Sequence, residues 1–204
     1  MEKTAVKKVH AEADMTKGSI IKCIALFTLP LLAGNFFQQL YNMVDTWVIG
    51  QTGDAGAYSA VGSVGPITNI YIGLFSGLAS GAGVVISQYF GANDNEKLSK
   101  TVHTSALITI ILSVVFTAVS LLLTPLMLQL MLRTTEGEIY PAAQTYLLIY
   151  FSGTVFTLVY NMGAAILRAV GDSKRPFYYL AVAAVINTVL DLVFVFNFDM
   201  GVAG

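Results

Sequence analysis

Hydrophobic positions along this chain form five long runs that short polar connections separate. Each run reaches the roughly 20 residues that a helix needs to cross a bilayer, and none shows the alternation typical of barrel strands. The pattern therefore predicts an all-α, polytopic membrane protein with five transmembrane helices. We expect a polar, basic amino-terminal tail over 1–18 and one transmembrane lobe over 19–204, with spans at approximately 19–49, 60–88, 100–131, 142–167 and 177–198.

Prolines and connections refine this map. Pro30 is expected to bend the first span, and Pro125 to kink the third span or end it early. The polar stretch 91–100 is expected to be a loop, and 168–176 a charged connection with Pro176 in the first turn of the next helix. In the second span, small residues recur at a spacing that favours close helix packing: Gly73, Gly77 and Gly81, with Ser76 and Ser80 beside them.

Composition supports the membrane assignment and narrows the function. Hydrophobic residues make up 55% of the chain and charged residues only 11%, whereas about a quarter of the residues in soluble proteins are charged. The net charge of -1 gives no support to a nucleic-acid partner. The lone Cys23 has no partner for an internal disulfide and no metal-ligand companion, so we expect a packing role.

Basic residues predict the orientation in the membrane. A cytoplasmic tail and cytoplasmic connections at 91–103 and 168–176 put ten of the eleven Lys and Arg residues inside, with Arg133 alone outside. The basic apolar start carries no convincing signal-cleavage site, so the first helix is expected to be retained. We therefore expect a multi-pass protein whose amino terminus is cytoplasmic and whose carboxyl end, in this chain, is external.

The first span carries a polar stripe. As a helix, it places Asn35, Gln38, Asn42 and Asp45 within one arc of roughly 80°. Lipid cannot satisfy amide or carboxylate groups, so such a face is expected to line a protein interior or a water-filled cavity.

Only two of the twelve acids, Asp45 and Asp191, lie within the expected spans. An intramembrane Asp costs about 2.5 to 3.5 kcal/mol on insertion scales and usually serves ion or proton handling. Asp191 follows Pro176 by roughly 22 Å of helix, so the two acids are expected to share one outward-facing cavity. Asn187 lies on the same helix face as Asp191, and the set is suited either to Na⁺ or to a proton.

Structural alternatives accompany each of these residues. Either acid is also consistent with a neutral carboxyl group that hydrogen-bonds neighbouring helices, and Asp45 with a carboxyl group that reaches interfacial water. Asn187 is also consistent with a packing role. In the fourth span, four residues are each as consistent with a structural role as with a cavity-lining one: Asn161, Tyr146, Tyr150 and Tyr160.

Five stretches carry a family resemblance. They are PLLAGNFFQQLYNMVDTWVIG from Pro30, AVGSVGP from Ala60, GLASGAGVVISQYFGA from Gly77, LRAVGD from Leu167 with Pro176 close behind, and INTVLDLVF from Ile186. In this order, from about Thr16 onward, they resemble the amino-terminal half of the multidrug and toxic compound extrusion (MATE) family.

This resemblance implies a cation-driven antiporter of the cell membrane, in which entry of H⁺ or Na⁺ drives export of amphipathic or cationic organic compounds. It implies no enzymatic activity and no cofactor beyond the coupling ion. The family's first-span acid matches Asp45, its fifth-span Asn and acid match Asn187 and Asp191, and Gln38 and Tyr41 fall at first-span positions that line the same cavity.

Similar proteins have twelve spans in two six-helix lobes around a central cleft. The chain is therefore expected to be an incomplete six-helix lobe, truncated and in need of a second lobe or another copy of itself. Substrate identity and the choice between H⁺ and Na⁺ stay open.

Two other functions remain as alternatives. A related lipid-linked oligosaccharide flippase is expected to line its cleft with basic residues, whereas no Lys or Arg is expected deep in a span here. The second alternative is a membrane fragment that does not transport. An intramembrane aspartyl protease is disfavoured, because neither NMVD at Asp45 nor VLDL at Asp191 matches its motifs.

Overall fold

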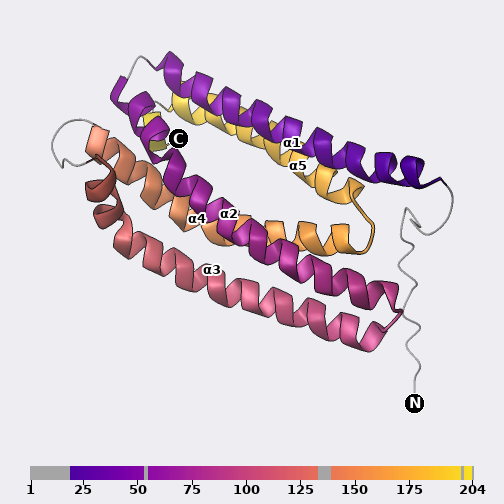
Figure 1. Cartoon of the computed structure of the whole chain (residues 1–204). Coiled ribbons are helices and arrows are strands. Elements are labelled where there is room, and N and C mark those ends of the chain that lie inside the picture. Colours follow the sequence, from indigo (N-terminus) through magenta and orange to yellow (C-terminus); the bar gives the residue numbers. More distant parts are fainter. Residues whose placement is uncertain (1–18, 53–54, 133–138, 199, 204) are drawn as a thin grey trace.

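The computed structural model describes residues 19–52, 55–132, 139–198 and 200–203. Five long helices run up and down in chain order (Figure 1). They are α1 (Ile20–Gln51), α2 (Ala55–Gly91), α3 (Asn95–Leu132), α4 (Ile139–Ala169) and α5 (Lys174–Asp191), followed by the π-helix η1 (Leu192–Asn197) and the short 3-10 helix η2 (Gly201–Ala203). The described residues contain no β-strand, which confirms the all-α prediction.

Five helical segments are long and apolar enough to cross a membrane, as predicted from the hydrophobic runs; the fifth, Lys174–Asn197, combines α5 with η1. The helices extend several residues beyond most of the expected spans. Pro125 does not end α3 early, because the helix continues to Leu132. Pro30 also lies inside a continuous helix.

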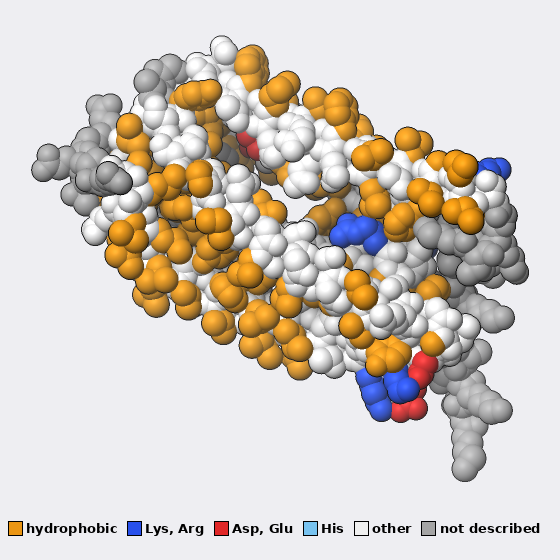
Figure 2. Space-filling model, in the orientation of Figure 1, with side chains coloured by type: hydrophobic (Ala, Val, Ile, Leu, Met, Phe, Trp, Pro, Cys, Tyr) orange, Lys and Arg blue, Asp and Glu red, His pale blue; other side chains and the backbone are white. Residues whose placement is uncertain are grey.

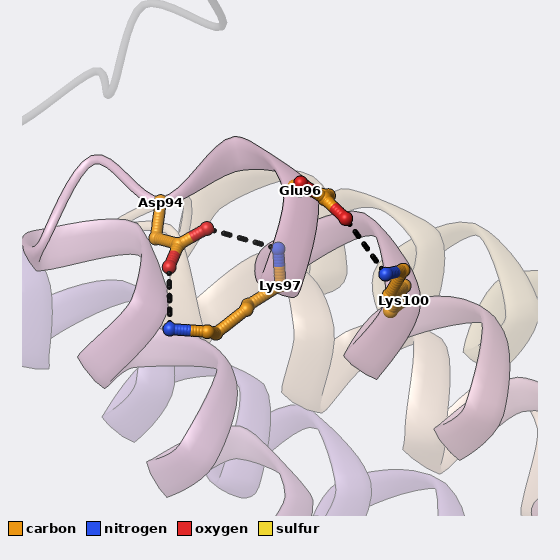
Figure 3. Close-up of polar contacts among 4 residues, drawn as sticks. All are labelled: Asp94, Glu96, Lys97 and Lys100. Carbon is orange, nitrogen blue, oxygen red and sulfur yellow. Dashed lines mark hydrogen bonds and ion pairs between the residues drawn. The ribbon is translucent and has the colours of Figure 1, made fainter.

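The α2–α3 connection is much shorter than expected (Figure 3). Asn93 adopts a φ of 56° and closes α2, and its N–H donates to the Phe90 carbonyl at 3.1 Å. Asp94 then caps α3: one carboxylate oxygen accepts the Lys97 backbone N–H at 3.1 Å, and the other pairs with the Lys97 ammonium at 3.0 Å. The expectation of a loop over 91–100 is therefore wrong for residues 95–100. An exposed Lys100–Glu96 pair at 2.7 Å follows on the first turns of α3.

The α4–α5 connection has the same two features, a residue with a positive φ followed by a capping Asp. Gly171 adopts a φ of 89°, and its N–H donates to the Arg168 carbonyl at 3.0 Å. Asp172 is buried, accepts the Arg175 backbone N–H at 3.1 Å and pairs with the Arg175 guanidinium at 3.0 Å. The expected connection over 168–176 is thus shorter, because α4 includes Arg168 and α5 already begins at Lys174.

The helices form two groups. Helices α2, α3 and α4 pack around a core that contains Val64, Leu128, Leu147 and Phe151. Helix α1 instead pairs with α5 along its length, and Figure 1 shows this pair beside the other three helices. A Cβ atom on Gly34 of α1 would lie 3.5 Å from Leu180 of α5, so the two helices approach closely there.

The glycine row of α2 does not make the close packing predicted for it. Among the described residues, a Cβ atom on Gly73, Gly77 or Gly81 would meet nothing within 4 Å. Helix α4 covers a different face of α2, where Gly83 lies close to the Ala165 carbonyl and Ala79 packs against Met162.

Candidate functional site

A cavity of about 410 Å³ lies between the two helix groups, toward the end of the bundle where α1 ends. Helix α1 contributes Asn42, Asp45 and Thr46 to its lining, and Asp191 approaches from the end of α5. Figure 2 shows acidic atoms inside the hollow on this face. Helices α2 and α4 supply the remaining polar groups: Thr68, Asn69, Tyr146 and Tyr150.

Two carboxyl groups face each other in this cavity. Asp45 and Asp191 line the same cavity and are close enough to interact electrostatically, although the two residues are far apart in sequence. One oxygen of each carboxyl group is buried and has no hydrogen-bond partner among the described residues. The side-chain oxygen of Asn187, one helical turn before Asp191, is also buried and unpartnered.

None of these three acceptor oxygens has a donor among the described residues. An unpartnered buried acceptor costs about 1 to 3 kcal/mol, and two nearby carboxylates also repel each other. A proton shared between the carboxyl groups, or a metal cation bound by carboxylate and amide oxygens, would relieve both penalties. Within 19–52, 55–132, 139–198 and 200–203, no group of three or more His, Cys, Asp or Glu side chains suits a metal ion.

The backbone changes at the acid of the fifth helix. Asp191 is the last residue of α5, and the chain continues as a π-helix in which the Phe198 N–H donates to the Val193 carbonyl at 3.2 Å. Single π-helical turns are rare and frequently occur at functional sites. The expected fifth span is therefore not one uniform helix.

The remaining candidate residues lie elsewhere. Gln38 donates a long hydrogen bond of 3.4 Å to the Tyr41 hydroxyl, and neither side chain lines the acidic cavity. Tyr41 is nevertheless close enough to Asp45 for an electrostatic interaction. Asn161 lines a different cavity.

Sequence reasoning missed the polar lining residues of α2 and left the two tyrosines of α4 undecided between a structural and a lining role. Asn69 is an amide inside an apolar run, and the test for polar residues at membrane depth would have identified it. Tyr146 and Tyr150 lie one turn apart on α4, and their rings stack with centroids 6.1 Å apart. No pattern in the sequence indicates that this turn of α4 faces Asp45.

The second cavity, of about 620 Å³, lies between the same helix groups toward the opposite end of the bundle. Its lining includes Phe27 of α1, Ser76 and Ser80 of α2, and Asn161 and Arg168 of α4. Figure 2 shows basic atoms in the hollow toward this end. The sequence assigned Arg168 to a connection, but the structure has it in the last turn of α4.

Comparison with known proteins identifies relatives of this fold. The sequence model of the MatE family matches residues 30–193. The chain is 35% identical over 191 residues to the probable multidrug resistance protein YpnP of Bacillus subtilis, covering 94% of this chain and 42% of YpnP. It is 26% identical over 188 residues to the multidrug export protein MepA of Staphylococcus saprophyticus, covering 92% of this chain and 41% of MepA.

A solved structure shares the arrangement of the helices. It is described as the outward-facing conformation of a multidrug resistance MATE family transporter, and it matches with a TM-score of 0.89 and 26% sequence identity. The match covers 97% of this chain and 43% of that structure. The chain thus spans less than half the length of the relatives it matches.

Proposed function

Since the chain belongs to the MatE family, we propose that it forms the amino-terminal lobe, over 19–204, of a cation-coupled antiporter in the cell membrane. The antiporter exports amphipathic or cationic organic compounds and takes up H⁺ or Na⁺ in exchange. It acts as a transporter rather than an enzyme, and a second lobe or a second copy completes its cleft. The names of YpnP and MepA, which describe multidrug resistance and export, support this activity.

The observation that carries the proposal is the acceptor set of Asp45, Asn187 and Asp191. The three buried oxygens, for which the described part of the chain supplies no donor, come from the pair of helices, α1 and α5, that packs apart from the others. A cation that enters this set stabilises the pair, and its departure restores the repulsion between the carboxylates. Occupancy of the site is thereby linked to the packing of α1 against α5.

The mechanism is a charge switch. With Asp45 and Asp191 ionised, the polar cavity holds water; neutralisation by H⁺ or Na⁺ lets α1 repack, with Pro30 as the bending point. A cation shifts the equilibrium only by its different affinity for the two arrangements, and that difference biases the cleft toward release of substrate. Each charge that enters across 100 mV contributes about 2.3 kcal/mol.

The cavity-lining residues give the site its remaining chemistry. Asn42 contributes an amide to the cavity wall, and Tyr146 and Tyr150 contribute aromatic surface. Outside the cavity wall, Tyr41 accepts the long hydrogen bond of Gln38 and lies close enough to Asp45 for an electrostatic interaction. Asn161 would meet substrate only in the second cavity.

Export of a fluorescent cationic dye from cells without their own pumps tests this function. The 204-residue chain and the chain continued through a second lobe are compared, each with Asp45→Asn and with Asp94→Asn. Asp94→Asn makes the same chemical change on an exposed cap at the other end of the bundle, so export should survive it. Asp45→Asn should lower export by the longer form at least about tenfold, because the switch loses its charge.

Two results would count against the proposal. Undiminished export with Asp45→Asn would exclude the charge switch. Absence of dye export, together with movement of a lipid-linked oligosaccharide in proteoliposomes, would favour the flippase. Imposing a pH gradient or a Na⁺ gradient separately on the same proteoliposomes identifies the coupling ion.

A further inference from the structure

The second cavity contains a guanidinium group that has no ion-pair partner among the described residues. Arg168 lines the cavity from the last turn of α4, and no carboxylate of the described residues forms an ion pair with it. The acid that follows one turn later, Asp172, already binds the backbone N–H and the side chain of Arg175. The nearby Tyr160 donates its hydroxyl proton to the Pro176 carbonyl at 3.2 Å.

The other polar groups of the cavity include hydroxyl donors. Ser76 and Ser80 come from successive turns of α2, and their hydroxyls make no hydrogen bond to the described residues. Ser87, by contrast, donates to the Val84 carbonyl at 2.8 Å. A guanidinium fork in the same cavity as two hydroxyls that have no partner among the described residues matches the donor pattern that phosphate oxygens need.

The position of the cavity indicates which kind of phosphate-bearing molecule it binds. It lies between membrane-spanning helices at the end where the described Lys and Arg residues gather, and Figure 2 shows it in a hollow bordered by apolar surface. Phe27 and the exposed Val84 form apolar walls beside Arg168. Basic pockets between transmembrane helices at the cytoplasmic level bind lipid headgroups, with the acyl chains along the apolar surface.

We propose that Arg168, Ser76 and Ser80 form a binding site for the phosphate of an anionic phospholipid. The site is separate from the Asp45–Asp191 cavity, at the opposite end of the split between the two helix groups. The lipid site does not depend on the coupling ion. A negative result in the lipid-binding test therefore leaves the proposed dye export standing, and a negative result in the export test leaves the lipid site standing. A lipid seated there bridges α1, α2 and α4.

Fluorescence quenching by brominated lipids tests the site. Trp47, the only tryptophan, is replaced by Phe, and Phe27→Trp puts a reporter in the cavity wall of the full chain. The reporter is compared in bilayers of dibromo-phosphatidylglycerol and dibromo-phosphatidylcholine. The relative binding constant should favour phosphatidylglycerol about fivefold.

Matched variants isolate the role of Arg168. Arg168→Gln should abolish the preference for phosphatidylglycerol, whereas Lys100→Gln, which removes an exposed charge near the same end, should retain it. Equal quenching by the two lipids before substitution, or an unchanged preference in Arg168→Gln, would overturn the proposal. If Arg168→Gln does not fold, the double variant Ser76→Ala/Ser80→Ala replaces it in the test. An unchanged preference for phosphatidylglycerol in that variant would likewise overturn the proposal.

Excess inorganic phosphate distinguishes a lipid from a free anion. At equal ionic strength, phosphate and chloride should affect the lipid preference equally, because the acyl chains contribute to binding. If phosphate selectively removes the preference, the site takes free phosphate and the lipid assignment is wrong.

Discussion

At the scale of single residues, unmet hydrogen-bonding capacity is concentrated in one place. Four buried side-chain atoms of the described residues lack a partner, and three of them belong to Asp45, Asn187 and Asp191. Folding normally avoids such groups, because each costs about as much as a lost hydrogen bond. The cost is consistent with a site that gives up stability for function.

The double variant Asp45→Asn/Asp191→Asn is expected to be more stable than the parent chain. It removes the repulsion between the carboxylates and supplies amide donors, so the free energy of unfolding should rise by about 1 kcal/mol or more. Thermal unfolding in detergent measures this. If Na⁺ is the coupling ion, saturating Na⁺ should raise the melting temperature of the parent chain and leave that of the variant unchanged. A variant that is less stable than the parent would contradict the charge-switch account.

Asp94 gives a prediction about pH. The Lys97 backbone N–H and then the Lys97 ammonium lower the pKa of the Asp94 carboxyl below its ordinary value. The ionised cap therefore favours the folded state above the unfolded pKa of about 3.9, and this contribution is lost as the pH falls through the lower folded pKa.

Carboxyl carbon NMR of Asp94 measures this titration. Lys97→Ala should raise the pKa of Asp94 only part of the way, because the larger contribution, the backbone hydrogen bond, remains. Lys100→Ala should raise it less, since Lys100 acts only through its more distant charge. A pKa that does not respond to Lys97→Ala would show that the ion pair is absent in solution.

At the scale of elements, the close pairing of α1 with α5 depends on Gly34. Its ideal Cβ position lies 3.5 Å from Leu180 and 3.9 Å from Phe177, so alanine fits there but a larger side chain does not. Gly77 of α2 offers a matched contrast, because nothing among the described residues lies near its Cβ position.

We expect Gly34→Val to destabilise the chain by about 1 to 3 kcal/mol through overpacking. Gly77→Val should change the stability by less than about 0.5 kcal/mol, as expected of a site without contacts. Unfolding curves of the two variants, recorded under the same conditions, provide the measurement. Equal losses would mean that the α1–α5 contact is looser than described, or that the glycine row of α2 is covered.

At the scale of the whole molecule, charge is segregated along the bundle axis. The basic residues of the described part lie at the start of α1 and around the α2–α3 and α4–α5 connections: Lys22, Lys97, Lys100, Arg168, Lys174 and Arg175. Because basic residues are retained in the cytoplasm, we propose that this end faces inward and the acidic cavity faces outward.

Labelling of single cysteines tests this orientation. In a Cys23→Ser background, Gln51→Cys at the end of α1 should react with a membrane-impermeant maleimide on intact cells. Glu96→Cys, on the first turn of α3, should react only after the cells are permeabilised. The reverse pattern would invert the proposed topology and place the acidic cavity on the cytoplasmic side.

The sequence by itself determined the class of fold and the number of helices. Length and hydropathy are enough for this, because lipid requires each span to satisfy its backbone hydrogen bonds within one continuous helix. The same reasoning selected Asp45 and Asp191 as candidate site residues, since a carboxyl group at membrane depth is costly wherever it lies. The sequence also predicted a shared cavity for both, and both line the same cavity in the structure.

Only the tertiary structure decided which faces meet. The glycine row of α2 has the spacing of a packing surface, yet α4 covers another face, because helix partners depend on the fit of whole surfaces. Tyr146 and Tyr150 line the acidic cavity, and Gln38 and Asn161 do not, for the same reason. The π-helix after Asp191 and the cavity position of Arg168 likewise arise from contacts between distant segments, which no local pattern encodes.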